Sequence, residues 1–199
     1  MSLIESMARL GKLETPVART NDAAAVWNTS PAGASQMLGR LAKAGYVCRL
    51  QRGLWLLDRT IQPWALHPFI TDPSPSYLSL QTALFHHGMI EQIPTTIHVV
   101  STAKSKTTTT VVGTFAIHQV VPTFFTDFQP LANGLAQIAT PEKALVDFFY
   151  FRPTKTRLFR ALPELELPKS FRKKRARELA ALIISRSRRK MVERLLNEL

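Results

Sequence analysis

The sequence has little of what several protein classes require. Its single cysteine, Cys48, cannot form an intrachain disulfide, and the lack of a cysteine pair excludes a disulfide scaffold and a zinc ribbon. No apolar run approaches the roughly 20 residues that a membrane-spanning helix needs. The first residues lack the basic flank and apolar stretch of a signal peptide. We therefore expect a protein of the reducing cytoplasm that has no membrane partner.

Catalytic patterns are also sparse. Eight glycines are scattered along the 199 residues, and none belongs to a phosphate-binding loop. His98 and His118 are candidates to meet across strands, but the missing cysteines and the few carboxylates nearby disfavour a zinc site. Asp127, Glu142 and Asp147 are conceivable nuclease carboxylates, although Glu142 is better explained as a charge at a helix N-terminus. We predict no enzyme, no catalytic residue, no metal and no cofactor, with an enzyme acting on nucleic acid as a competing hypothesis.

Positive charge dominates the composition, with 26 Lys and Arg against 14 Asp and Glu. The net charge of +12 divides unevenly: +4 in residues 1–60, −2 in residues 61–150 and +10 in residues 151–199. Lys and Arg gain free energy by displacing the counterions of a polyanion. This asymmetry favours a nucleic-acid partner over a basic surface kept only for solubility.

The first sixty residues have the pattern of three helices followed by a hairpin. Helical spacing of apolar residues covers 2–10, a short capped helix covers 22–27, and Pro31 begins a helix that ends at Gly45. Two β-type runs then flank the turn residues 51–53. This order predicts a winged helix-turn-helix, a DNA-binding domain spanning residues 1–60.

The third helix has the surface that a DNA recognition helix needs. On a helical wheel, Arg40 and Lys43 lie within about 40° of Gln36, and the apolar residues occupy the opposite side. Arg pairs bidentately with guanine and Gln with adenine, whereas Lys43 is placed to meet phosphate. A solvated helix face would look the same, but it would not explain the basic hairpin tip. We predict that DNA is contacted by Ser30, Gly33, Ser35, Gln36, Arg40 and Lys43 in the helix and by Arg49, Gln51 and Arg52 in the wing.

The remaining sequence predicts a mixed domain and a basic tail, so that the fold class is α+β. In residues 61–165 we expect a proline-rich connection, a helix starting at Ser76, β-branched strands near 96–101 and 111–121, and a capped helix from Thr140. Residues 166–199 are helical and basic, and we expect them to pack on the α/β domain. Their charge runs predict a DNA phosphate or partner surface, with a solvated face as the alternative, at Arg172, Lys173, Lys174, Arg175, Arg188, Arg189 and Lys190.

Several motifs together resemble the AbiEi family, which comprises transcriptional regulators that are the antitoxins of type IV toxin–antitoxin systems. The central motif is YLSLQTAL, HGMIEQIP and IHVVS, in that order. Upstream of this motif, LAKAGYV resembles the end of the family's recognition helix and RGLW resembles its wing. Downstream of it, ATPEKALVD resembles the family's closing helix. Trp55 departs from the tyrosine that the family more often has in its wing. The resemblance covers roughly residues 1–150.

The resemblance implies a repressor that autoregulates its operon by binding operator inverted repeats, with self-association on DNA. It also implies an antitoxin that counteracts a nucleotidyltransferase toxin without forming a stable complex with it. Two alternatives remain open at this point. One is a stand-alone transcriptional regulator without a toxin partner. The other is an RNA- or ribosome-associated binding protein that uses the basic tail.

Overall fold

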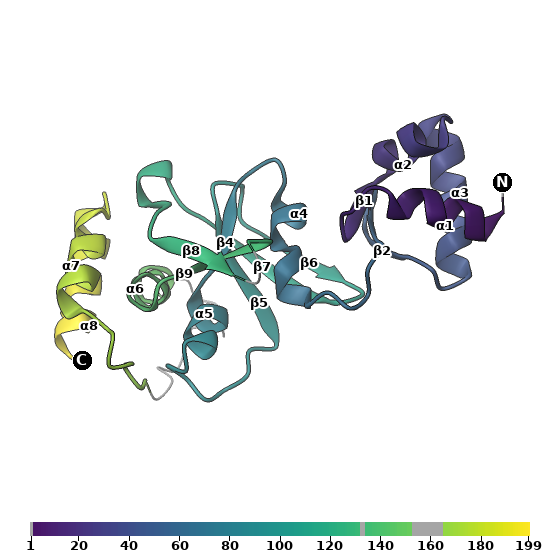
Figure 1. The fold of residues 1–199 in the computed structure, drawn as a ribbon. Helices are drawn as coiled ribbons and strands as arrows, with labels where there is room; N and C mark the ends of the chain where they lie inside the picture. The colour runs from purple at the N-terminus through teal and green to yellow at the C-terminus, as the bar shows by residue number, and fades with distance from the viewer. Residues whose placement is uncertain (1, 132–133, 153–164) are drawn as a thin grey trace. The chain divides into compact units, whose positions relative to one another are not determined.

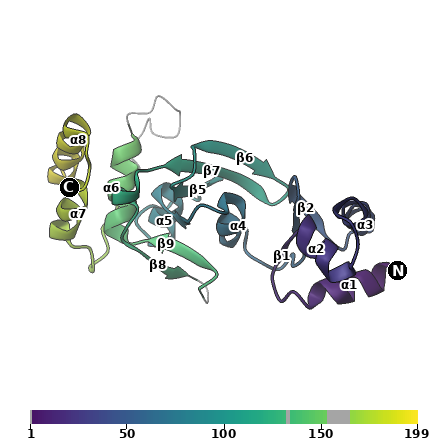
Figure 2. The same ribbon diagram turned by 90° about the horizontal axis from the view of Figure 1, so that it is seen from above.

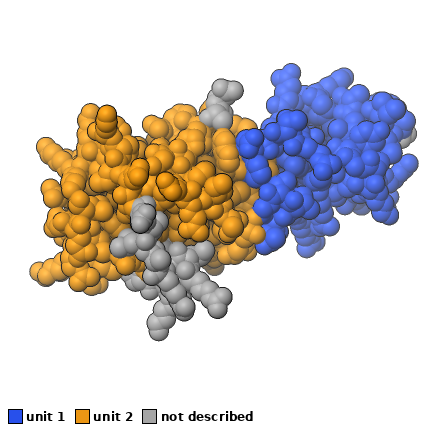
Figure 3. Space-filling view, turned by 90° about the horizontal axis from the view of Figure 1, so that it is seen from below, with its two compact units in different colours: residues 1–63, 109–113 blue, residues 64–108, 114–199 orange. Residues whose placement is uncertain are grey.

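The computed structural model describes residues 2–131, 134–152 and 165–199, and it divides the chain into two compact units (Figure 3). Unit 1 consists of residues 1–63 and 109–113, and unit 2 consists of residues 64–108 and 114–199. Helices and strands are both abundant, which agrees with the α+β class. Within the described ranges, no helix is both long enough and apolar enough to cross a bilayer.

Unit 1 combines three helices with a small antiparallel sheet (Figure 1). Its strands are arranged in the order β1-β3-β2, so the last strand of the chain in this sheet lies in the middle. The sequence predicted no strand before the second helix, yet β1 pairs with β3 there. The elements are α1 (Leu3–Gly11), β1 (Val17–Arg19), α2 (Thr20–Trp27), α3 (Pro31–Lys43), β2 (Cys48–Gln51) and β3 (Leu54–Leu56).

The core of unit 1 joins all three helices to the sheet. Leu10 of α1, Trp27 of α2 and Leu38 of α3 are buried together with Val47 and Trp55. The indole N–H of Trp27 donates to the carbonyl oxygen of Ser6 at 3.1 Å, which satisfies its polar group inside this core. The three helices are therefore fixed to one another by large side chains.

Unit 2 is built on a mixed six-stranded sheet with the order β6-β7-β5-β4-β9-β8. β4 pairs antiparallel with β5 and parallel with β9, and β5 pairs parallel with β7. Its first elements are η1 (Pro63–Leu66), α4 (His67–Thr71), β4 (Ser76–Leu78), α5 (Leu80–His86), β5 (Thr96–Ser101), β6 (Lys106–Thr110) and β7 (Gly113–Gln119). They are followed by η2 (Pro122–Phe124), β8 (Phe128–Leu131), β9 (Ala136–Ala139), α6 (Pro141–Phe151), α7 (Lys173–Ala181) and α8 (Arg186–Asn197).

The helix α6 is the centre of the helical side of unit 2. It contacts α5 and β9, and α7 and α8 pack on it and on each other (Figure 2). Nine of its eleven residues are buried, which is expected of a helix covered on all sides. Residues 173–197, which the sequence assigned to a basic tail, thus supply two helices to the layers of unit 2.

Three stretches differ from the sequence-based expectation. Ser76 begins the buried strand β4 rather than a helix, and the helix α5 starts only at Leu80. The proline-rich connection contains the short helices η1 and α4. The predicted C-terminal helix is interrupted after Ala181, and α8 begins as a separate helix at Arg186. In each case a short apolar segment is compatible with more than one backbone state, and tertiary contacts select among them.

Candidate nucleic-acid interface

The helix α3 is anchored in unit 1 along one side and at its N-terminus. Ser30 precedes the helix and its hydroxyl oxygen accepts a hydrogen bond from the Gly33 N–H at 3.1 Å. Pro31 occupies the first turn. Backbone N–H groups in a first turn have no acceptor within the helix, so proline, which lacks an N–H, costs no hydrogen bond there. Leu38 and Leu41 are completely buried. Ser30 therefore has a structural role at the helix start in addition to the DNA contact predicted for it.

The other side of α3 is exposed and carries the predicted polar residues. The side chains of Ser35, Gln36, Arg40 and Lys43 all reach solvent. Gln36, Arg40 and Lys43 lie within one helical face, because they are spaced by four and three residues along an unbroken helix. The structure thus brings an amide, a guanidinium and an ammonium group together on the side of α3 opposite the core.

Gly33 lies at the first turn of α3, where a larger side chain would not fit without movement. A Cβ atom built on it would lie 2.8 Å from the hydroxyl oxygen of Thr29. A hollow of about 470 Å³ opens beside it, bordered also by Asn28 and by Arg9 of α1. Asn28, Thr29 and Arg9 are not among the predicted DNA contacts. The position of Arg9 could not be predicted, because only the tertiary fold brings it next to the start of α3.

The strands β2 and β3 form a hairpin with basic residues near its turn. Gln51 pairs with Leu54, and Arg52 and Gly53 connect them, with Gly53 at a φ of 76° that favours glycine. Arg49 and Arg52 are exposed, whereas Gln51 is half-buried.

Trp55 stabilises the base of this hairpin from both sides. The Arg49 guanidinium carbon lies 5.8 Å from the centre of the Trp55 ring, which is within the range of a cation–π contact. The Trp55 indole N–H donates to the Thr20 hydroxyl at 3.1 Å. This contact places the Arg49 guanidinium over the Trp55 ring, and the Arg49 side chain remains exposed.

The seven predicted residues of the basic tail fall into two groups. Arg175 forms ion pairs with Asp127 and Glu178, Arg188 lies over the Tyr150 ring at 4.7 Å, and the Arg189 side chain donates to the Ile183 carbonyl at 2.8 Å. These three arginines hold α7 and α8 in place. The other four are exposed, and the structure shows no side-chain partner for them within the described residues; they are Arg172, Lys173, Lys174 and Lys190.

The three carboxylates that were considered as nuclease ligands do not converge on one point. Asp147 is completely buried, Glu142 accepts a hydrogen bond from the Arg172 backbone N–H at 2.7 Å, and Asp127 binds Arg175 and the Thr140 hydroxyl. No cluster of three or more His, Cys, Asp or Glu residues suited to a metal ion occurs in the part of the chain that the structure describes.

Asp147 is instead the centre of a buried polar cluster. Its carboxylate accepts hydrogen bonds from the Lys143 ammonium at 2.5 Å, from the Ser79 hydroxyl at 2.7 Å and from the Tyr77 hydroxyl at 3.1 Å. Burial raises the pKa of Asp147 and lowers the pKa of Lys143, and the charge of each group opposes the shift of the other. The Lys143 ammonium also lies 3.4 Å from the centre of the Phe124 ring. Since none of these groups reaches solvent, the cluster is a structural one.

Two histidines, the buried His98 and the half-buried His118, do meet across strands. The Nδ1 atom of His98 lies 3.1 Å from the Nε2 atom of His118, and their rings are stacked. Burial lowers the pKa of His98 to about 3 and that of His118 to about 4, so both are neutral at pH 7. A neutral imidazole has one donor and one acceptor nitrogen, which is what this hydrogen bond requires.

No protein-family model matches the chain, and a comparison with curated proteins also gives no match. The residues of the exposed face of α3 are therefore the strongest indication of what the chain does.

Proposed function

We propose that the chain binds duplex DNA through unit 1, which acts as a winged helix-turn-helix with α3 as its recognition helix and the β2–β3 hairpin as its wing. One observation carries the proposal: Gln36, Arg40 and Lys43 share the exposed face of α3, while Leu38 and Leu41 fix the opposite face in the core. A recognition helix needs this combination, because its position in the groove is only as accurate as its packing.

The chemistry of this face fits base and phosphate contacts. Arg40 presents a fork of N–H donors that matches the acceptors of guanine, and Gln36 can pair with adenine. Lys43, in the last turn of α3, is suited to phosphate. The small residues at the start of the helix, Gly33 and Ser35, let the backbone approach the groove. In the wing, Arg49 and Arg52 are placed for contact with the DNA backbone or the minor groove.

We further propose that the protein represses its own operon and is the antitoxin of a type IV pair. This part depends on the resemblance of residues 1–150 to the AbiEi family. The functional partner would then be a nucleotidyltransferase toxin that is counteracted without a stable complex, and unit 2 is the part of the chain left for that task. A regulator without a toxin uses unit 1 in the same way.

The decisive experiment is fluorescence anisotropy with the duplex upstream of the gene and with a shuffled duplex, across a salt series. At least tenfold selectivity, about 1.4 kcal/mol, that survives near-physiological salt supports a sequence-specific repressor. Equal binding of both duplexes that disappears as salt rises contradicts it, because such binding reflects charge alone. In that case, tight binding of structured RNA would favour the RNA- or ribosome-associated alternative.

The antitoxin role has a separate test. Co-expression with the neighbouring gene should relieve growth arrest if that gene encodes the toxin. The matched control is a variant with Arg40→Ala and Arg52→Ala, which we expect to lose repression and to keep its protective effect. Loss of protection in this variant, with unchanged protein level, would contradict the assignment of the antitoxin role to unit 2.

A further inference from the structure

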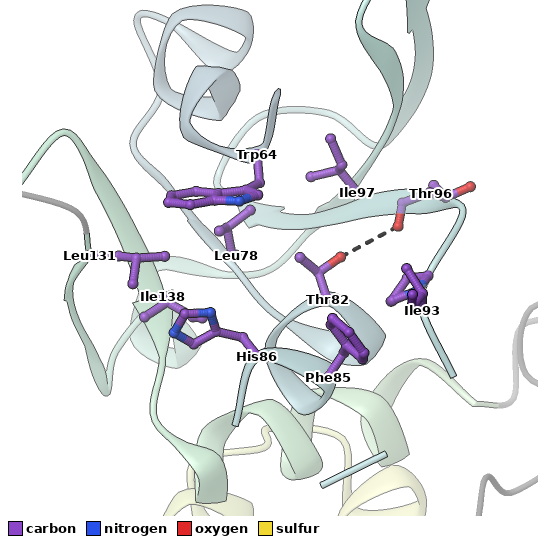
Figure 4. Close-up of a pocket in the computed structure, with 11 residues that line it drawn as sticks. Trp64, Leu78, Thr82, Phe85, His86, Ile93, Thr96, Ile97, Leu131 and Ile138 are labelled. Carbon is purple, nitrogen blue, oxygen red and sulfur yellow. Dashed lines mark hydrogen bonds between the residues drawn. The ribbon is translucent and has the colours of Figure 1, made fainter. Parts of the chain in front are cut away.

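Unit 2 contains a hollow of about 350 Å³ that the proposed DNA contacts do not use. Figure 4 shows the flat Trp64 ring on one side of it and the rings of Phe85 and His86 on the other. Ligand pockets in proteins typically have volumes of about 300–1,000 Å³, so this hollow suits a small molecule of one or two rings. Its walls come from η1, α5 and four strands, and they are formed largely by Trp64, Leu78, Phe85, Ile97, Leu131 and Ile138.

The lining of this hollow carries no formal charge. Among the described residues, no Asp, Glu, Lys or Arg side chain borders it, and its one titratable side chain is that of His86. A charged ligand would lose its hydration there without gaining an ionic partner, which is strongly unfavourable. The occupant that fits is therefore neutral and largely apolar, and the aromatic walls favour a planar ring that stacks between them.

The polar groups of the hollow indicate which hydrogen bond a ligand can make there. The Thr82 hydroxyl is already engaged, since it donates to the Thr96 carbonyl at 3.4 Å and accepts from the His98 N–H at 2.8 Å. His86 is exposed at the edge, and the structure gives its ring no hydrogen bond within the described chain. Burial and the neighbouring His87 lower the pKa of His86, so its imidazole is neutral at pH 7 and keeps an acceptor nitrogen.

We propose that this hollow is a binding site for a neutral, planar aromatic molecule that donates one hydrogen bond to His86. The site belongs to unit 2 alone and is independent of DNA binding. Trp64 and Phe85 hold the ring, and the apolar side chains of β4, β5 and β9 form the floor. A protein partner is a poorer occupant, because standard protein interfaces bury about 800 Å² on each side, far more than a recess for one ring system.

Indole is a suitable probe because it is neutral, planar and carries one N–H donor. In amide-resolved NMR titrations of the full chain, we expect saturable shifts at Thr82, Phe85 and Ile97 with a Kd of about 1 mM or tighter. Indole-3-carboxylate has the same ring with a negative charge, and we expect it to bind at least tenfold more weakly. Shifts confined to other parts of the chain, or equal binding of the carboxylate, would overturn the proposal.

The role of His86 is tested by a pair of ligands. His86→Ala should weaken indole binding about fivefold, as the loss of one hydrogen bond predicts. The same variant should change the affinity for 1-methylindole less than twofold, since that ligand has no N–H to donate. An equal loss for both ligands would contradict a hydrogen bond to His86.

Two variants that fill the hollow with a larger side chain test whether indole binds there. Ile97→Trp should abolish indole binding, and its amide spectrum reports whether the sheet still forms. Ile93→Trp adds the same ring at the edge, where Ile93 is 72% exposed, and should weaken binding at least tenfold. Ile184→Trp, at a position 70% exposed and away from the hollow, is the matched control and should have no effect. Shifts of the lining amides with protein concentration alone would assign the hollow to a second copy and overturn the proposal.

Discussion

The ammonium of Lys143 lies 2.5 Å from a carboxylate oxygen of Asp147, and both side chains are completely shielded from water. They are one helical turn apart on α6, a spacing that on an exposed helix contributes only a few tenths of a kcal/mol. Inside unit 2 the same pair matters far more for stability, because each buried charge is compensated by the other. Removing one partner leaves a buried charge without compensation.

We therefore expect Lys143→Met to destabilise unit 2 by about 3–5 kcal/mol. The double variant Lys143→Met, Asp147→Leu should recover more than half of that loss, because it removes both charges. Urea unfolding of the two variants and the parent measures the difference. A single variant as stable as the parent would mean that Asp147 is neutral or solvated in the native state.

Acid should destabilise unit 2 through three histidines, of which His67 and His98 are buried and His118 is half-buried. Burial lowers the pKa of His67 and His98 to about 3 and that of His118 to about 4, against 6.5 for a free histidine. Below pH 6.5 the unfolded chain binds protons that the folded one does not. Each histidine then costs about 1.4 kcal/mol per pH unit, until the pH reaches its folded pKa.

The loss is measured by chemical denaturation at pH 7, 6 and 5, where most carboxylates stay ionised. Going from pH 7 to pH 5 should cost about 2 kcal/mol for each of the three histidines. His118→Leu should reduce the slope by about a third. A pH-independent stability over this range would show that these imidazoles are not held neutral.

Arg40→Ala should weaken operator binding by about 1–3 kcal/mol and relax selectivity at one base pair. Arg40 is exposed on α3, so the fold should not change. Lys43→Ala is the comparison: it should weaken binding to all duplexes alike and reduce the salt slope by about 1. Unchanged affinity of the Arg40 variant for every duplex would disprove the assignment of α3.

Ser30→Ala should destabilise unit 1 by about 1 kcal/mol, since the Gly33 N–H loses its acceptor. Ser35→Ala changes a similar hydroxyl on the exposed side of α3 and should leave stability within about 0.5 kcal/mol. Thermal unfolding of both variants separates the two roles. Ser35→Ala should lower DNA affinity without a loss of stability, whereas Ser30→Ala should lower both. Unchanged DNA affinity of the Ser30 variant would leave Ser30 with its structural role alone.

The unpartnered lysines of α7 and α8 test whether this surface touches DNA. Lys174→Gln with Lys190→Gln should flatten the salt dependence by about 0.9 for each phosphate contact that is lost. The matched control is Lys104→Gln with Lys106→Gln, which removes the same charge elsewhere. If the slopes of the two double variants equal that of the parent, the basic surface faces solvent or a protein.

Local sequence patterns were sufficient to predict the exposed face of α3. Its start at Pro31 and its apolar stripe follow from the residues of one helix, and the structure has both. The cap by Ser30 was not predicted and is a finding of the structure. The hairpin turn around Gly53 was predictable for the same reason, because a positive φ at a tight turn favours glycine. Whether this face contacts DNA remains a prediction.

Features that depend on distant residues were not predictable. The strand β4 is three consecutive buried residues, and such a run has no period that distinguishes it from a helix. The spacing of Lys143 and Asp147 is typical of a solvent-exposed ion pair, and only the packing of α7 and α8 on α6 makes it a buried one. The hollow beside Trp64 brings together side chains from positions 64 to 138, which no local pattern connects.

The enclosure of α6 limits how this protein can change over evolutionary time. Strand β9 and the helices α5, α7 and α8 pack around it, so almost every substitution there must be compensated by a second one. Most solvent-facing positions of α3, α7 and α8 are not packed in this way, so a single substitution there disturbs few neighbours. Relatives that bind new operators or new partners should therefore differ in residues of these three helices, while the sequence of α6 changes little.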